Sequence, residues 1–237
     1  MGSKNRIAKH IVPILQEYID KNPNAPYIEP FVGGANIIDK IKAKTRVGVD
    51  INKYLIALFK HLQADGSLPD SVSKSDFDAV RGKKDFYPEW YVGCVGFLAG
   101  FNGRFFDGGY AKTGVHGGKE RNYYDEAKRN LLMQAEFIKD VKFDAYDYRN
   151  LHFKNAIAYC DPPYSNGKRY SINKDFDSNE FWEWARRASE SNQVIISEQN
   201  APEDFECIWE QEITRNIHRE KTFKAVEKLF VWKGGRA

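Results

Sequence analysis

The first 62 residues of this chain alternate between segments with the pattern of helices and segments with the pattern of strands. Apolar side chains recur at helical spacing from 7 to 18, and an extended run follows from 27 to 31. A second helix is predicted over 36–43, a buried strand over 46–51 and a third helix over 54–62. Such an alternation is typical of an α/β protein with an open, largely parallel sheet.

A segment of different composition interrupts this alternation between residues 65 and 122. It is rich in Asp, Ser, Gly, Lys and aromatic residues, and a helix is predicted to follow it over 123–138. Strand-like runs then resume and occupy residues 141–145, 156–160, 193–197 and 228–232. We therefore expect residues 1–64 and 123–237 to form one α/β domain with helices on both faces of its sheet. Residues 65–122 would form an inserted lobe that is mainly helical or loop-like.

The bulk composition points to neither a strongly charged protein nor a stapled fold. The chain has 36 Lys and Arg residues against 33 Asp and Glu residues, a formal charge of +3, so an anionic partner must be bound by a local patch. Its cysteines, Cys94, Cys160 and Cys207, have neither disulfide-framework nor metal-ligand spacing. The longest apolar run, 91–101, is interrupted by glycines and too short to cross a bilayer. We expect a soluble cytoplasmic protein that binds neither a metal nor a membrane.

The motif Asp161-Pro162-Pro163-Tyr164 directly follows the apolar run 156–160, which places it at the carboxyl end of a predicted strand. Open α/β sheets bind their ligands at this end. Each proline fixes its own φ and holds the preceding residue extended, and neither has an N–H group to donate. The motif therefore forms a stiff loop that offers two acceptors, the carboxylate of Asp161 and the carbonyl oxygen of Pro162. A rigid turn with an aspartate cap is the alternative interpretation.

Two neighbouring acceptors suit an amino group on an aromatic ring, which has two hydrogens to donate. Its nitrogen is a poor nucleophile because the lone pair is delocalised into the ring. Acceptors on both hydrogens favour the pyramidal form, whose lone pair can attack a methyl group held nearby. The ring of Tyr164 adds a flat surface on which a base can stack, worth about 1–3 kcal/mol. The motif thus predicts methyl transfer to an aromatic amine.

A glycine pair and an acid mark the ends of the first two predicted strands. Gly33-Gly34 follows the run 27–31, and Asp50 lies near the end of the run 46–51. A glycine-rich turn after one strand and an acid after the next is the pattern of a nucleotide-type cofactor site. A lone glycine pair is equally compatible with a tight turn that binds nothing.

Two motifs in this order resemble those of a known family. Glu29-Pro30-Phe31-Val32-Gly33-Gly34 followed by Asp161-Pro162-Pro163-Tyr164 resembles the signature of the Dam-type DNA adenine-N6 methyltransferases, which have a recognition insertion between the two motifs. Gly2-Ser3-Lys4 and Gly48-Val49-Asp50-Ile51 resemble two further motifs, whereas Ala35 stands where the family usually has a glycine. The resemblance implies a Rossmann-like methyltransferase sheet with an inserted target-recognition lobe. It also implies S-adenosylmethionine as cofactor and S-adenosylhomocysteine as product.

The resemblance implies roles for individual residues as well. The residues that it places at the cofactor are Lys4, Phe31, Gly33, Gly34, Asp50, Asp147, Tyr148, Asp161 and Tyr170, and its catalytic residues are Asp161, Pro162, Pro163 and Tyr164. Asp50 would bind the ribose hydroxyls, and Lys4 would lie near the cofactor and the flipped base. Asp161 would contact both the methionine part of the cofactor and the target amine. The alternatives are a solvated charge for Lys4, a helix cap for Asp50 and a turn acid for Asp147.

An enzyme that methylates a base in duplex DNA must flip the base out, hold the backbone and read the flanking bases. The residues that suit these tasks are Asn102, Arg104, Lys112, His116, Lys119 and Arg121 in the insertion, and Lys168 and Arg169 after the catalytic motif. Arg104 lies between a glycine-permitted turn and two phenylalanines that would anchor its loop, so we assign it to base reading, and Lys168 and Arg169 to phosphates. A solvated polar loop is the alternative for each. The expected partner is double-stranded DNA, with a weak homodimer on the DNA as one arrangement.

Other functions are compatible with the same motifs. A methyltransferase for cytosine N4, for adenine in RNA or for a protein glutamine is the nearest alternative. Asp161 favours adenine by family analogy, because cytosine enzymes more often have Ser and the protein and ribosomal-RNA enzymes more often Asn at this position, and adenine in RNA stays open. An inactive DNA-binding module would be expected to lack one catalytic element, and an NAD-dependent oxidoreductase is disfavoured because Gly33-Gly34 lacks the GxGxxG spacing. We therefore predict site-specific methylation of the N6 amine of a flipped-out adenine in DNA.

Overall fold

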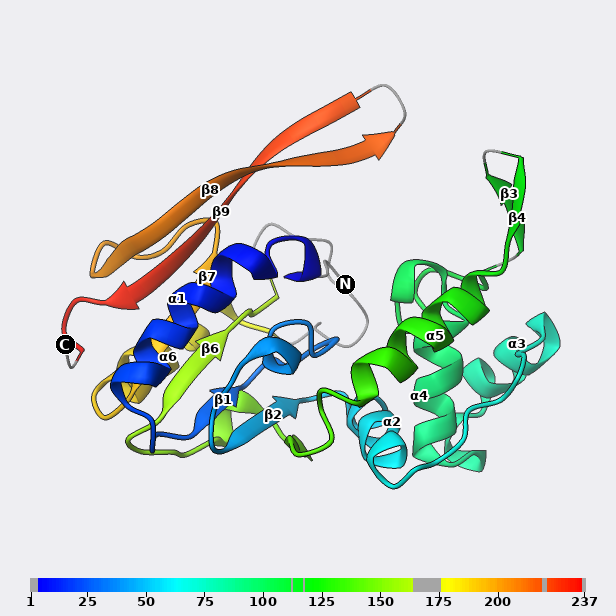
Figure 1. The fold of residues 1–237 in the computed structure, drawn as a ribbon, viewed down its shortest axis with the longest axis horizontal. Coiled ribbons are helices and arrows are strands. Elements are labelled where there is room, and N and C mark those ends of the chain that lie inside the picture. The colour runs from blue at the N-terminus through cyan, green and yellow to red at the C-terminus, as the bar shows by residue number, and fades with distance from the viewer. Residues whose placement is uncertain (1–3, 112, 117, 164–175, 219–220, 236–237) are drawn as a thin grey trace.

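A single seven-stranded sheet organises the molecule (Figure 1). The computed structural model describes residues 4–111, 113–116, 118–163, 176–218 and 221–235, with the side chains at 115, 116, 119 and 213–225 left aside. The strand order is β5-β2-β1-β6-β7-β9-β8. The strands span Tyr27–Glu29 (β1), Arg46–Asp50 (β2), Lys142–Ala145 (β5), Ile157–Cys160 (β6), Gln193–Glu198 (β7), Phe205–His218 (β8) and Lys221–Trp232 (β9).

The first five strands of this sheet are parallel, and the last two form an antiparallel hairpin. Strand β1 lies between β2 and β6, with Tyr27 opposite both Arg46 and Ile157. The chain therefore runs outward from β1 to β5 on one side and from β6 to β7 on the other. The order reverses at β1, and this is the point at which open α/β sheets bind ligands beyond the carboxyl ends of their strands. The predicted Rossmann-like α/β class is confirmed.

Helices cover both faces of the sheet. Alternate residues of its strands are therefore buried against opposite layers of helices. In β6, Ile157 and Tyr159 belong to the core cluster that contains α1 (Ala8–Lys21). Ala158 and Cys160 belong to the cluster that contains α6 (Ser178–Ser189). This period of two, with apolar side chains in both directions, is what a parallel sheet buried on both faces requires.

Residues 53–135 add a helical lobe beside the sheet (Figure 1). Its helices span Lys53–Gln63 (α2), Lys74–Gly82 (α3), Glu89–Leu98 (α4) and Tyr123–Ala135 (α5), and a small hairpin consists of Gly114–His116 (β3) and Lys119–Arg121 (β4). Helix α4 packs closely on α2, since a Cβ atom at Gly93 would lie only 2.1 Å from the carbonyl oxygen of Tyr54. The apolar run 91–101 is thus mostly a buried helix of this lobe. Within the described residues, no helix has the length and apolar character needed to cross a membrane.

The helix predicted over 36–43 is wrong. Only one 3₁₀ turn, Ile38–Lys40 (η2), forms there, and Ile41 is already extended. The reason lies in partners from outside the segment. Arg46 donates a 2.7 Å hydrogen bond to the carbonyl oxygen of Ile38, while the Gln16 side chain bonds both the N–H and the carbonyl oxygen of Lys42. These contacts satisfy backbone groups that a helix would otherwise pair, and the β-branched isoleucines have low helix propensity.

The hairpin of β8 and β9 is much longer than the strand predicted over 228–232. Strand β8 pairs with β9 from Phe205 opposite Trp232 to His218 opposite Lys221. Strand β9 alone joins the sheet, through Ile196–Glu198 of β7. Its mixed polar and apolar sequence carries little alternation because much of the hairpin projects past β7, as Figure 1 shows. Only the part that pairs with β7 has the apolar pattern that the sequence revealed.

Candidate active site

Acidic residues lie at the carboxyl ends of four adjacent parallel strands. Glu29 ends β1, Asp50 ends β2, Glu198 ends β7 and Asp161 directly follows β6. Because β2, β1, β6 and β7 are neighbours in this order, the four carboxylates lie along one edge of the sheet. The sequence predicted Asp50 and Asp161 at this edge. Glu198 was missed, although an acid at the end of a strand-like run is the same signal that identified Asp50.

The turn after β1 is braced by Asp50. Gly33 has a φ of +48° and Ala35 a φ of +54°, both in the left-handed region that favours glycine. This conformation accounts for the glycine that the resembled family usually has at the position of Ala35. The N–H of Gly33 donates to Oδ2 of Asp50 at 3.1 Å, and the N–H of Asn52 donates to Oδ1 at 2.9 Å. Burial raises the pKa of Asp50, and these two N–H groups offset part of the rise.

The helix-cap interpretation of Asp50 is wrong. Asn52 caps α2 instead, because its side-chain oxygen accepts from the N–H groups of Tyr54 and Leu55. The amide nitrogen of Asn52 is buried and makes no hydrogen bond within the described residues. Asp50 is thus held by the turn before it and the cap after it, with one backbone hydrogen bond on each oxygen and further lone pairs remaining.

An aromatic cluster borders the same turn. The rings of Phe31 and Tyr148 lie 4.9 Å apart, and Phe176 and Phe181 pack around them. The hydroxyl of Tyr148 is buried and has no hydrogen-bond partner within the described residues, and burial raises the pKa of Tyr148 to about 12. Phe31 and Tyr148, both assigned to the cofactor from the sequence, are therefore brought together by the fold.

Asp147 has the turn-acid geometry that was its alternative interpretation. Its carboxylate accepts from the backbone N–H of Arg149 at 3.0 Å and pairs with the guanidinium of the same residue. The Arg149 side chain holds the pKa of Asp147 below its ordinary value. Arg149 also approaches Glu180 of α6 at 3.4 Å, so Asp147 is tied to both the 3₁₀ turn Tyr148–Asn150 (η5) and α6. These contacts neither require nor exclude the predicted role at the cofactor.

Lys4 and Asp161 form an ion pair, although they are separated by more than half of the chain. The ammonium nitrogen of Lys4 lies 3.2 Å from Oδ1 of Asp161 and 2.8 Å from Oε2 of Glu227. Lys4 is only 7% exposed, so the solvated-charge interpretation is wrong. Nothing in the sequence pointed to Glu227, which immediately precedes the run that predicted β9.

Burial dominates the ionisation of the remaining edge carboxylates. Glu29 is 2% exposed and accepts a 2.8 Å hydrogen bond from the hydroxyl of Tyr27, yet burial raises its pKa well above the ordinary value. Burial likewise raises the pKa of Glu198 to about 7, although the N–H of Gln199 donates to it at 3.1 Å. The charge of Asp161 adds to this rise, and that of Lys4 opposes it. The edge thus holds one carboxyl group, that of Glu198, with a pKa raised to about 7, beside a second, that of Glu29, whose pKa burial also raises.

We expect the wild-type protein to lose stability relative to a Glu198→Gln variant as the pH rises from about 4.5 to about 7. The pKa of Glu198 is raised in the folded state, so folding favours its protonated form, and this contribution is present below the unfolded pKa and lost as the pH passes the folded pKa. The variant has no such group to ionise. Melting temperatures of both proteins measured across this range give the difference, and parallel curves would contradict the assignment.

Two of the residues predicted in the insertion, Asn102 and Arg104, lie in a loop that buried phenylalanines anchor. Phe105 and Phe106 are buried at 8% and 5% exposure, as predicted for an anchor, whereas Asn102 is exposed with a φ of +56°. Arg104 is half-buried between them. Arg121 ends β4 and is engaged within the lobe, since its Nε donates to Glu126 at 2.7 Å and its guanidinium lies over the ring of Tyr123.

Several predicted residues fall outside the described part of the structure. These are Lys112, Tyr164, Lys168, Arg169 and Tyr170, together with the side chains of His116 and Lys119. Pro162 and Pro163 are described and follow Asp161 without regular secondary structure. The two predicted acceptors, Asp161 and Pro162, therefore belong to the described residues, whereas the predicted stacking ring and phosphate contacts lie outside them, and the roles of all stay predictions.

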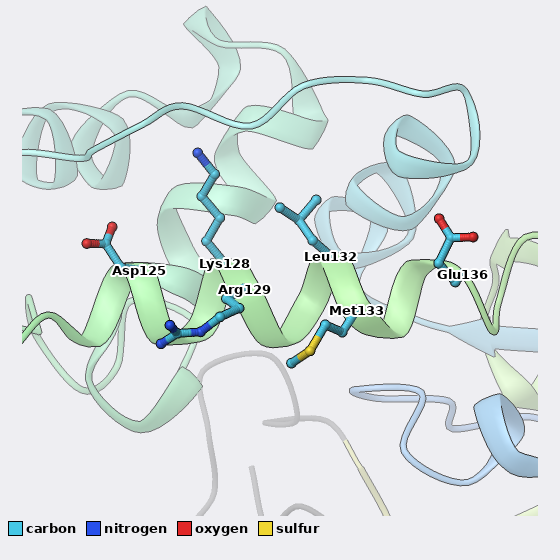
Figure 2. Close-up of a pocket in the computed structure, with 6 residues that line it drawn as sticks. All are labelled: Asp125, Lys128, Arg129, Leu132, Met133 and Glu136. Carbon is cyan, nitrogen blue, oxygen red and sulfur yellow. The ribbon is translucent and has the colours of Figure 1, made fainter.

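Two surface hollows lie along α5. One, of about 560 Å³, is bounded by Asn5 of the N-terminal turn, by Gly34 and Asn36 after β1 and by the α5 side chains Asn130 and Phe137 among others. It therefore adjoins the turn that Asp50 braces. The other, of about 490 Å³, lies on α5 itself and contains no residue predicted for the site (Figure 2). Met133 borders both hollows, so α5 forms one wall of the space beside the Gly33 turn.

Comparison with known proteins finds a family model and curated proteins that are similar to parts of this chain. Residues 1–91 match the family model described as D12 class N6 adenine-specific DNA methyltransferase. The chain is 23% identical over 190 residues to the type II methyltransferase M.FokI of Planomicrobium okeanokoites, and 25% identical over 187 residues to the modification methylase StsI of Streptococcus sanguinis. Each match covers 69% of this chain but only 28% of the relative, so the chain spans less than a third of their length.

The solved structure of PH1948 from Pyrococcus horikoshii matches 95% of this chain and 80% of its own, with a TM-score of 0.45 and 11% identity. The family match contains Lys4, the Gly33-Gly34 turn and Asp50, and ends before Asp161. The resemblance to the DNA adenine-N6 methyltransferases is thus confirmed for residues 1–91, which contain the first of the two motifs. Residues 1–91 of this chain are thus similar to the D12 class N6 adenine-specific DNA methyltransferases.

Proposed function

We propose that this chain transfers a methyl group from S-adenosylmethionine to the N6 amine of adenine in DNA. The observation that carries the proposal is the placement of Asp161 at the carboxyl end of β6, with its carboxylate paired to Lys4 and the braced Gly33 turn on the adjacent strand β1. The family match over residues 1–91 supports the same activity. Asp161 lies outside the matched residues, whereas Lys4 and Gly33 lie within them.

The residues around the Gly33 turn fit a nucleoside cofactor. Asp50 keeps carboxylate lone pairs available for ribose hydroxyls, and Phe31 and Tyr148 offer apolar ring surfaces beside it. The amide nitrogen of Asn52 and the hydroxyl of Tyr148 are buried polar groups without partners in the described part of the chain, and such groups mark places where a polar ligand can bind. S-adenosylmethionine would supply an electrophilic methyl group on a sulfonium. Lys4, Gly34 and Asp147 complete the proposed set.

Asp161 and Pro162 would act on the target amine. The carboxylate and the adjacent carbonyl oxygen would each accept one hydrogen bond from the amine. These hydrogen bonds would orient the nitrogen lone pair and stabilise the positive charge that the nitrogen gains as the new N–C bond forms. One hydrogen then leaves as a proton, and Asp161 is the acceptor in contact with it. Pro163 keeps the loop stiff, and Tyr164 would stack on the base.

We further propose that residues 65–122 form the target-recognition lobe and that duplex DNA is the substrate. Cytosine N4, adenine in RNA and an inactive DNA-binding module are the competing interpretations. Incubation with labelled cofactor and duplex DNA, single-stranded DNA or RNA separates the substrates, with Asp161→Ala as the inactive control. Sequencing the genome of a methylation-free host that expresses the protein would report both the modified base and its sequence context. Methyl transfer to RNA alone, or to cytosine, would overturn the proposal.

Arg104→Ala is expected to weaken binding to the cognate duplex by about 1–3 kcal/mol and to broaden the methylated motif at one base pair, as loss of a bidentate guanine contact does. Arg104 is half-buried and directly precedes the buried Phe105 and Phe106, which fits a side chain held in one direction. By contrast, neutralising Lys168 or Arg169 should reduce the salt dependence by about one unit of slope without changing the motif. Binding isotherms at several salt concentrations and motif sequencing measure both. Equal weakening on cognate and random duplexes would make Arg104 a phosphate contact.

A further inference from the structure

The ammonium group of Lys4 is shared between two carboxylates. It lies 2.8 Å from Glu227 and 3.2 Å from Asp161, and the side chains of Lys4 and Glu227 are 7% and 3% exposed. Glu227 comes from β9, at the opposite end of the chain from Lys4, and belongs to neither of the two signature motifs. The proposed function has so far given this residue no task.

The pair of Lys4 and Asp161 alone would be electrically neutral. In methyl transfer the positive charge moves from the sulfonium to the amine, so the amine gains charge next to Asp161. A neutral pair stabilises this charge far less than a carboxylate with a net negative charge, particularly in a site shielded from water. Glu227 shares the charge of Lys4, and its Oε2 lies closer to the ammonium nitrogen than Oδ1 of Asp161 does, so Lys4 neutralises Asp161 less than it would alone. Asp161 then remains an effective acceptor while Lys4 fixes one of its oxygens.

Stability alone does not account for Glu227. Burying a second carboxylate beside an existing ion pair costs free energy, and replacing a whole buried set of charges by well-packed apolar residues is often neutral or stabilising. The cost is raised further by neighbouring acids, since Glu198 and Glu29 lie at the same edge and their pKa values are elevated by burial. A buried charge that costs folding free energy and lies next to the reacting group is expected where that charge contributes to catalysis.

We infer that Glu227 is a positioning residue for methyl transfer, which shares the charge of Lys4 and so keeps more of the negative charge of Asp161 effective toward the target amine. This inference rests on the proposed function. It concerns a residue that acts through Lys4 and does not itself touch the substrate.

The test is a double-mutant cycle between Glu227→Gln and Lys4→Met, measured at saturating DNA and cofactor. Glu227→Gln should lower kcat by about 10- to 100-fold with little change in KM, because charge is lost while shape is kept. Adding Lys4→Met should restore part of kcat, since the charge that Glu227 balanced is gone. Glu227→Asp, which keeps the charge, should retain more activity than Glu227→Gln. Glu210→Gln is the matched control, because Glu210 is an exposed carboxylate of the same hairpin, paired with Lys228 at 3.5 Å.

A kcat of Glu227→Gln equal to wild type, or effects that simply multiply in the double variant, would overturn the inference. A second readout does not need turnover. Loss of the Glu227 charge should lower the pKa of Glu198 from about 7, which a ¹³C NMR titration of the glutamate carboxyls measures in the unbound protein. An unchanged titration would also overturn the inference. If the wild type methylates no substrate but the Glu198 titration shifts, the proposed function fails while the charge coupling stands.

Discussion

Replacing Asp161 with alanine is expected to lower kcat by about 10³-fold, close to abolishing methyl transfer. The variant removes one of the two proposed acceptors for the target amine, the proposed acceptor of the departing proton and one of the partners of Lys4 at once. It also leaves Lys4 and Glu227 as a neutral pair beside the amine. Single-turnover measurements with labelled cofactor report the chemical step directly.

Asp161→Asn sharpens this test. The amide keeps the shape and one acceptor oxygen but loses the charge, so we expect intermediate activity if geometry contributes and near-complete loss if charge dominates. Binding of cofactor and DNA to both variants is the control, because a loss confined to kcat locates the effect in the transition state. Near-normal turnover of Asp161→Ala would refute the catalytic assignment of the motif.

Asp50→Ala is expected to raise the dissociation constant for S-adenosylmethionine by about 10- to 100-fold, the loss of roughly 1.5–3 kcal/mol from hydrogen bonds to a charged acceptor. The variant also frees the N–H groups of Gly33 and Asn52, so the turn that would receive the cofactor loses its brace. Isothermal titration calorimetry measures the change.

Asp144→Ala is the matched control for this experiment. Asp144 lies on β5, which pairs with β2 so that Asp144 is opposite Val49, but its side chain is 70% exposed. It should bind the cofactor as the wild type does. Unchanged affinity in Asp50→Ala would limit Asp50 to bracing the turn.

The parts of the site that the sequence revealed are those with strong local signals. Asp161 and Asp50 were predicted because each follows a short apolar strand, and chemistry at the carboxyl ends of parallel strands depends only on strand order. The buried phenylalanines after Arg104 were predicted from their position after a glycine-permitted turn. In each case the sequence signal lies within a few residues of the motif, although contacts of Asp161 and Asp50 come from farther away, from Lys4 and Gly33.

The parts that were missed depend on contacts between distant segments. The 36–43 helix fails because Gln16 and Arg46 satisfy its backbone groups from outside. Glu227 has no local signal because its role comes from Lys4, more than two hundred residues away in sequence. Long-range pairing of this kind cannot be read from periodicity or propensity, which describe neighbours along the chain.

The strand order also constrains how the protein can be synthesised. Strand β9 is made after β8, yet it lies between β7 and β8 in the sheet. While the chain leaves the ribosome, β8 therefore has no strand to pair with and the edge of β7 stays open, a state prone to association with other chains. Folding of this edge must wait for β9, so premature termination near residue 220 should yield insoluble rather than merely inactive protein.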